Sequence, residues 1–119
     1  MNKLPPQAIK EEQAVIGSII MNNELIYRIM DFIDISDFYD LENKKVYSAI
    51  LKLFNSGKKI DFLSLKGCVD NSYLINLTNG DFVSANIKQY ADVVKDKSIR
   101  RQLIEAQGNN EELIYNEKE

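Results

Sequence analysis

Residues 5–20 read PPQAIKEEQAVIGSII, and the interpretation of the whole chain starts from this stretch. Two prolines open it, and proline suits the first turn of a helix, where its missing N–H would have no partner. Ile9, Ile16 and Ile20 recur at the spacing of one helical face. Glu11 and Glu12 lie near the positive end of the helix dipole. We therefore expect a helix over residues 8–21.

Gly17 interrupts the apolar face of this predicted helix. A glycine inside a helix costs roughly 1 kcal/mol relative to alanine. Its place on an apolar face is explained if another helix approaches closely there, and the alternative is a glycine with no packing role. We expect the close approach.

Apolar residues keep a helical spacing through the rest of the chain, and polar turns separate the groups. No proline occurs after Pro6 to interrupt them. We expect helices over residues 24–33, 41–55, 62–69 and 73–77, with Gly57 in a left-handed conformation after residue 55 and Asp61 as the next N-cap. The fold class predicted is all-α, a compact bundle of about five or six helices ending in a long helix.

The last stretch, from Ser84 onward, has two apolar faces. Ile87, Ala91 and Val94 share one face, but the next apolar residue, Ile99, follows Val94 by five positions, which fits neither a three nor a four spacing. One long helix whose halves pack on different partners would give this pattern. A helix broken at residues 96–98 would give it too. We favour the long helix, with a weak point at residues 108–110.

Composition excludes most kinds of catalytic site. The 119 residues suit one domain with a real core. The chain has no histidine and one cysteine, Cys68, so histidine-based acid–base chemistry, Cys/His zinc sites and internal disulfides are excluded. Cys68 itself reads as a small core residue. These counts fit a reducing, cytoplasmic setting.

No motif for nucleotide or metal binding is present either. The glycines form neither a phosphate-binding P-loop nor a dinucleotide fingerprint, and the clustered acidic residues lack calcium-loop spacing. We therefore predict no catalytic, cofactor-binding or metal-binding residues. The apolar runs are far shorter than the roughly 20 residues that cross a bilayer, so no membrane partner is expected.

A net charge of −3 argues against strong DNA binding by this chain alone, because phosphate neutralisation drives such binding. A local basic stripe around Lys95, Lys97, Arg100 and Arg101 is the alternative. The more ordinary reading is a solvated helix face.

Four stretches together resemble the N-terminal domain of bacterial replicative DNA helicases, the DnaB family. They are residues 5–20, Asp37-Phe38-Tyr39, Ser84-Ala85-Asn86-Ile87 and residues 97–106. The resemblance spans nearly the whole chain, about residues 4–106. This chain departs from the family in a shorter segment at residues 68–74 and at Asp81-Phe82-Val83.

The resemblance implies an assembly module without catalysis of its own. In the family this domain is a helical head followed by a helical hairpin, and the domains form a collar on a hexameric helicase ring. Hairpins pair to give a trimer of dimers, and the collar offers a docking surface for primase and sometimes for a helicase loader. ATP and Mg²⁺ belong to a separate C-terminal RecA-like domain of the parent helicase.

On this basis residues 1–95 are the globular head and residues 96–119 the first part of the hairpin, whose second helix is absent. A hairpin cut there leaves an apolar stripe uncovered, and exposed apolar stripes seek partners. We expect Ile99, Leu103 and Ala106 to pack on a two-fold mate. Tyr73 and Tyr90 are expected near the head–hairpin junction, where partners could dock. For all five residues, plain core packing is the competing interpretation.

A second function class stays open: a small helical nucleic-acid-binding domain of a phage or plasmid replication protein. The acidic balance of the chain argues against it. A salt-dependent DNA affinity that depends on Lys97, Arg100 and Arg101 would favour it.

Overall fold

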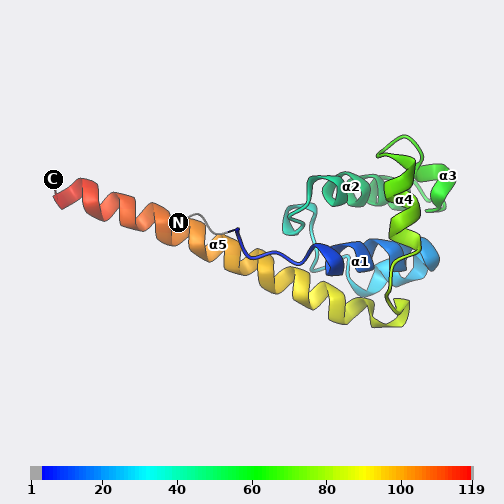
Figure 1. The fold of residues 1–119 in the computed structure, drawn as a ribbon, viewed down its shortest axis with the longest axis horizontal. Helices are drawn as coiled ribbons and strands as arrows, with labels where there is room; N and C mark the ends of the chain where they lie inside the picture. Colours follow the sequence, from blue (N-terminus) through cyan, green and yellow to red (C-terminus); the bar gives the residue numbers. More distant parts are fainter. Residues whose placement is uncertain (1–3, 119) are drawn as a thin grey trace.

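The computed structural model describes residues 4–118, with side chains described for residues 4–108. In Figure 1, four α-helices gather into a head at one end, and the fifth runs beside α1 and then extends well beyond the head. Within residues 4–118 the secondary structure is helical, with five α-helices, three short 3₁₀ helices and no strand. The predicted all-α class is confirmed.

Helix α1, Ile9–Met21, lies at the centre of the head, next to α2, α4 and α5. Val15, Ile16 and Ile19 are completely buried. The expected close approach at Gly17 is confirmed: a Cβ added there would lie 2.4 Å from the carbonyl oxygen of Leu77 and 2.6 Å from the ring of Phe82. Only glycine lets the end of α4 and the following loop lie this close to α1.

Residues 24–33 do not form the predicted α-helix. The chain forms a 3₁₀ helix, η1, over Asn23–Arg28, followed by turns. Asn23 explains the difference: its side chain donates to the carbonyls of Ile19 and Ile60, both at 2.8 Å, and accepts from the Ile60 N–H at 2.8 Å. These hydrogen bonds hold the start of the segment in place. The tight turns bury Ile26, which is 0% exposed, as completely as a full α-helix would.

Helix α2, Leu41–Asn55, has the predicted bounds. The Asp40 side chain caps it by accepting from the Asn43 N–H, and Gly57 follows it with φ 68°. Its apolar stripe is wide, but α2 leaves one face to solvent, and α1 takes the central position in the bundle.

The next two helices differ from expectation in length. Helix α3 covers only Phe62–Leu65, with the predicted Asp61 cap accepting from the Ser64 N–H at 2.8 Å. Gly67, with φ 98°, turns the chain two residues after α3 ends, so a helix to residue 69 cannot form. Helix α4, Asn71–Thr78, is longer than the predicted 73–77.

Helix α5, Ile87–Lys118, follows a 3₁₀ turn, η3, Ser84–Asn86, and continues without a break through residues 96–98 and Gly108. The favoured single long helix is confirmed. Its 32 residues correspond to about 48 Å of helix. Ile87, Ala91 and Val94 are buried against the head. The proposed division between residues 95 and 96 therefore falls inside one continuous helix and stays a prediction.

Candidate subunit-interaction surface

A buried carboxylate attaches α5 to the head. Asp37 is 2% exposed and lies at the end of the 3₁₀ helix η2, Ile35–Asp37. Ser98 donates to its carboxylate at 2.7 Å, and the Lys95 ammonium lies 3.2 Å away. The backbone N–H of Asp34 donates to the same carboxylate at 2.7 Å. We call Asp37, Lys95, Ser98 and Arg101 the Asp37 clip.

Arg101 extends the clip by one turn of α5. Its guanidinium donates from Nη2 to the Asp37 carbonyl at 2.7 Å and from Nη1 to the Pro6 carbonyl at 2.8 Å. It also lies over the ring of Tyr39, 5.5 Å from the ring centroid. One side chain thus joins three segments: the N-terminal stretch, the η2 turn and α5.

The basic stripe that the sequence analysis gave as an alternative is largely engaged within the molecule. Lys95 and Arg101 belong to the Asp37 clip, and Arg100 pairs with Asp96 at 2.9 Å on the same helix. Lys97 has no ion pair among the described residues. The structure therefore leaves little free positive charge at this stripe for phosphates.

Alongside the clip and beyond it, α5 carries apolar side chains that the described chain leaves largely exposed. Ile99 is 45% exposed and Leu103 63%, and Ala106 is exposed too. These three residues follow the i, i+4, i+7 spacing of one helix face, so the structure brings them together as predicted. We call Ile99, Leu103 and Ala106 the α5 stripe.

Ile104 is an apolar residue that the sequence analysis left out. It is 57% exposed and lies off the α5 stripe, because one residue along a helix turns the face by about 100°. A groove between the N-terminal stretch and α5 brings it together with Leu4, Pro5 and Pro6. The sequence signal available for Ile104 was its apolar side chain in the outer half of the predicted long helix. It was passed over because Ile104 is out of register with the α5 stripe.

Tyr73 and Tyr90 lie apart from this stripe. Tyr73, on α4, donates its hydroxyl to the Asn43 side chain on α2, close to Asp40 and Gln13. Burial, reinforced by the nearby Asp40 and Glu12, raises the pKa of Tyr73 to about 12. Tyr90, on the first turn of α5, accepts from the Val83 N–H at 2.9 Å. Both rings are partly buried against the core, and their proposed partner role stays a prediction.

Glu12 is a buried carboxylate that the sequence analysis assigned only to a helix end. It is 1% exposed and accepts from the N–H groups of Tyr39 and Asp40 at 2.8 and 3.2 Å, and from the Asn43 amide at 3.0 Å. These bonds fix the N-terminus of α2 against α1. The role is structural, since all contacts are internal.

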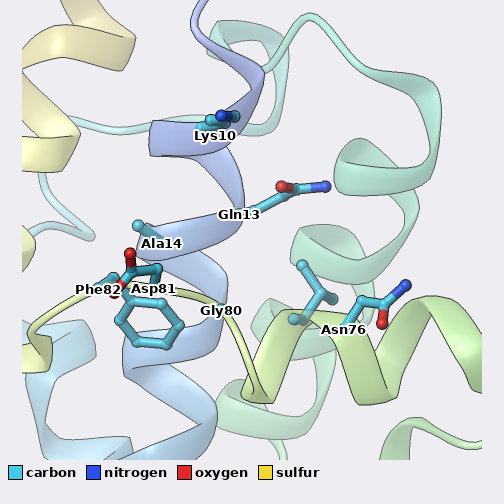
Figure 2. Close-up of a pocket in the computed structure, with 8 residues that line it drawn as sticks. Lys10, Gln13, Ala14, Asn76, Gly80, Asp81 and Phe82 are labelled. Carbon is cyan, nitrogen blue, oxygen red and sulfur yellow. The ribbon is translucent and has the colours of Figure 1, made fainter.

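A small pocket lies between α1 and the end of α4 (Figure 2). Lys10, Gln13 and Ala14 from α1 meet Asn76 from α4, and Gly80, Asp81 and Phe82 from the loop after it. No ion pair joins Lys10 to Asp81 in the described chain. Among the described residues no three His, Cys, Asp or Glu side chains gather to hold a metal.

The described helices include none with both the length and the apolar character needed to cross a bilayer.

A comparison with protein families matches residues 4–96 to the DnaB-like helicase N terminal domain. The chain belongs to this family. The family match ends just before the α5 stripe, so it covers the head and the first turns of α5.

Two curated relatives of this DnaB N-terminal domain are named as replicative helicases. The chain is 34% identical over 113 residues to Replicative DNA helicase DnaC of Bacillus subtilis, covering 87% of the chain and 25% of the relative. It is 35% identical over 124 residues to Replicative DNA helicase DnaB of Nostoc sp., covering 96% and 14%. The chain thus spans a quarter or less of the length of these relatives.

A solved structure agrees with this DnaB assignment. The crystal structure of the N-terminal domain of DnaB helicase from Mycobacterium tuberculosis matches with a TM-score of 0.90 and 27% identity, over 97% of this chain and 89% of that one. The resemblance inferred from four short stretches of sequence is confirmed by the family, by the relatives and by this structure.

Proposed function

We propose that this chain is the N-terminal collar and assembly domain of a hexameric replicative DNA helicase. It mediates subunit association and docks primase or a helicase loader during DNA replication in the cytoplasm. It has no catalysis of its own, and ATP, Mg²⁺ and the ATPase chemistry belong to another domain of the parent protein. Family membership and the names of the relatives support this proposal.

The observation that carries the assembly role is the exposed α5 stripe. Ile87, Ala91 and Val94 of α5 are buried on the head, whereas Ile99 and Leu103, further along the same helix, are 45% and 63% exposed. Apolar side chains gathered on a projecting helix are stabilised when a second helix covers them. A two-fold pair, in which each α5 covers the other, is the simplest closed arrangement.

Sedimentation equilibrium over a range of concentrations tests the assembly role. The chain is expected to associate, and Leu103→Glu is expected to weaken association at least about tenfold, because burying an unpaired charge costs well over 1 kcal/mol. Gln89→Glu is the matched control. It adds the same charge to an exposed position of α5, ten residues or more before the stripe residues Ile99 and Leu103.

A chain that stays monomeric at high concentration contradicts the proposal. Equal weakening by Leu103→Glu and Gln89→Glu also contradicts it, because the effect would then come from charge and not from the stripe. Circular dichroism checks that both variants keep their helices, which is expected because both positions are exposed.

A further inference from the structure

Positive charge is concentrated in one part of this acidic chain. Residues 44–66 contain six lysines, no arginine and a single carboxylate, Asp61. The whole chain carries 15 basic and 18 acidic residues. The remainder is therefore strongly acidic, and the lysines stand out as a local feature that neither the assembly role nor the Asp37 clip uses.

Several of these lysines line one groove on α2. The groove is lined by Lys44, Lys45 and Lys52, together with Ser48, Ala49 and Cys68. Helix α2 lies on the side of α1 away from α5, so the groove is separate from the α5 stripe (Figure 1). We call this feature the α2 lysine groove.

Few carboxylates of the chain lie close enough to neutralise the lysines of the groove. Lys45 lies 3.6 Å from Glu42, an exposed pair of small energetic value. Lys44 and Lys52 have no carboxylate within 4 Å among the described residues. Lys52 follows Lys44 and Lys45 by about two turns of the same helix. Like charges held on one helix repel each other, so an incoming group of negative charges would relieve that repulsion.

We propose that the α2 lysine groove docks an acidic segment of a partner protein that carries apolar side chains among its carboxylates. This inference rests on the proposed docking role and names the surface and the chemistry of the partner. Carboxylates meet the lysines at the rim, and apolar side chains meet Ala49 and the partly buried Cys68.

Three features favour a protein segment over a nucleic acid. No aromatic side chain lines the groove, so it has no platform for stacked bases. No arginine contributes the planar fork that suits phosphates. The chain as a whole is negatively charged, which opposes the long-range attraction that brings DNA to its binders.

Fluorescence anisotropy with defined probes tests this proposal. The probe is a labelled glutamate-rich helical peptide with two leucines one turn apart. A peptide with serines in place of the leucines and an oligo-dT strand are compared with it. The groove variant is Lys44→Gln with Lys45→Gln and Lys52→Gln. The matched control, Lys10→Gln with Lys88→Gln and Lys97→Gln, has the same net charge but leaves the groove intact.

The leucine peptide is expected to bind the unchanged chain in a salt-dependent manner. The groove variant is expected to lose about tenfold in affinity, roughly the sum of three surface ion pairs near the middle of their range. The control variant keeps the affinity, and the serine peptide binds more weakly than the leucine peptide.

Four results would overturn the proposal: no binding of the leucine peptide, equal loss in both triple variants, equal binding of the serine peptide, or tighter binding of oligo-dT at the groove. Sedimentation of the same samples separates this inference from the proposed function. If the chain associates but does not bind the peptide, only the proposal for the α2 lysine groove is refuted. Association lost in the groove variant alone would make a second copy the occupant and would also refute the proposal.

Discussion

At the scale of single residues, a buried chain of hydrogen bonds connects three helices of the head. Glu12 on α1 accepts from the Asn43 amide on α2, and Asn43 accepts from the Tyr73 hydroxyl on α4. Asn43 is completely buried and Glu12 nearly so. Buried polar groups are costly when unpaired, so this chain of bonds specifies how the three helices meet.

Tyr73→Phe is predicted to destabilise the fold by about 0.5–1.5 kcal/mol at neutral pH, the usual net value of a hydrogen bond. This loss is expected to shrink as the pH rises. Because burial raises the folded-state pKa of Tyr73 to about 12, its contribution is complete below the ordinary value of 10.0 and is lost as the pH rises through about 12. Urea unfolding of both proteins at a series of alkaline pH values measures the difference, and a gap independent of pH would contradict the argument.

The roles of Glu12 and Asp37 could not be read from the sequence. Glu12 was assigned to the helix dipole, which describes the local chain correctly, and Asp37 was named only in a stretch that resembles the family. What was missing is the partner: Glu12 meets Asn43 31 positions later, and Asp37 meets Ser98 61 positions later. A single sequence gives no signal for pairings over such distances, whereas the register of the α5 stripe is local and was predicted.

At the scale of elements, the two glycines inside helices give opposite predictions. Gly17→Ala is expected to destabilise the fold by about 1–3 kcal/mol, because the added Cβ would lie 2.4 Å from a backbone oxygen of α4 that cannot move freely. This cost exceeds the roughly 1 kcal/mol that alanine gains in a helix. Thermal or urea unfolding monitored by circular dichroism measures it.

Gly108→Ala is the matched control for this substitution. An added Cβ at Gly108 meets nothing within 4 Å, and the residue lies inside α5. Helix propensity alone then applies, so the change is expected to stabilise α5 by up to about 1 kcal/mol. The explanation for Gly17 is wrong if the two variants change stability in the same direction.

The elements were predictable where local signals agree. Residues 41–55 have an N-cap, an apolar face and a glycine after the end, and α2 has those bounds. Residues 24–33 have the same apolar spacing, but Asn23 bonds to Ile60, and this tertiary contact selects tight turns over an α-helix. For α5 the sequence allowed either a continuous helix or one broken at residues 96–98. The structure shows a continuous helix whose Ser98 and Arg101 bond to the head.

At the scale of the whole molecule, the direction of α5 relative to the head determines where the α5 stripe is presented. The molecule measures 57 Å along its long axis and 27 Å across, mainly because α5 projects from the head. A small change of angle at the Asp37 clip would therefore move the outer end of α5 by several ångströms. Assembly through the α5 stripe depends on that angle. A single buried carboxylate, Asp37, therefore influences how two copies of the chain can pair.

Asp37→Asn is predicted to loosen this attachment while leaving the helices formed. The amide keeps the shape of the carboxylate but carries no charge for Lys95 and offers one acceptor oxygen to Ser98 and the Asp34 N–H, which now compete for it. Distances between spin labels on α2 and on the outer part of α5 are expected to spread over a wider range. Asp96→Asn is the control, because it removes the same charge from an exposed pair within α5 that does not reach the head. Equal widths for both variants would show that α5 is held by apolar packing of Ile87, Ala91 and Val94 alone, and the clip would then have no part in setting its direction.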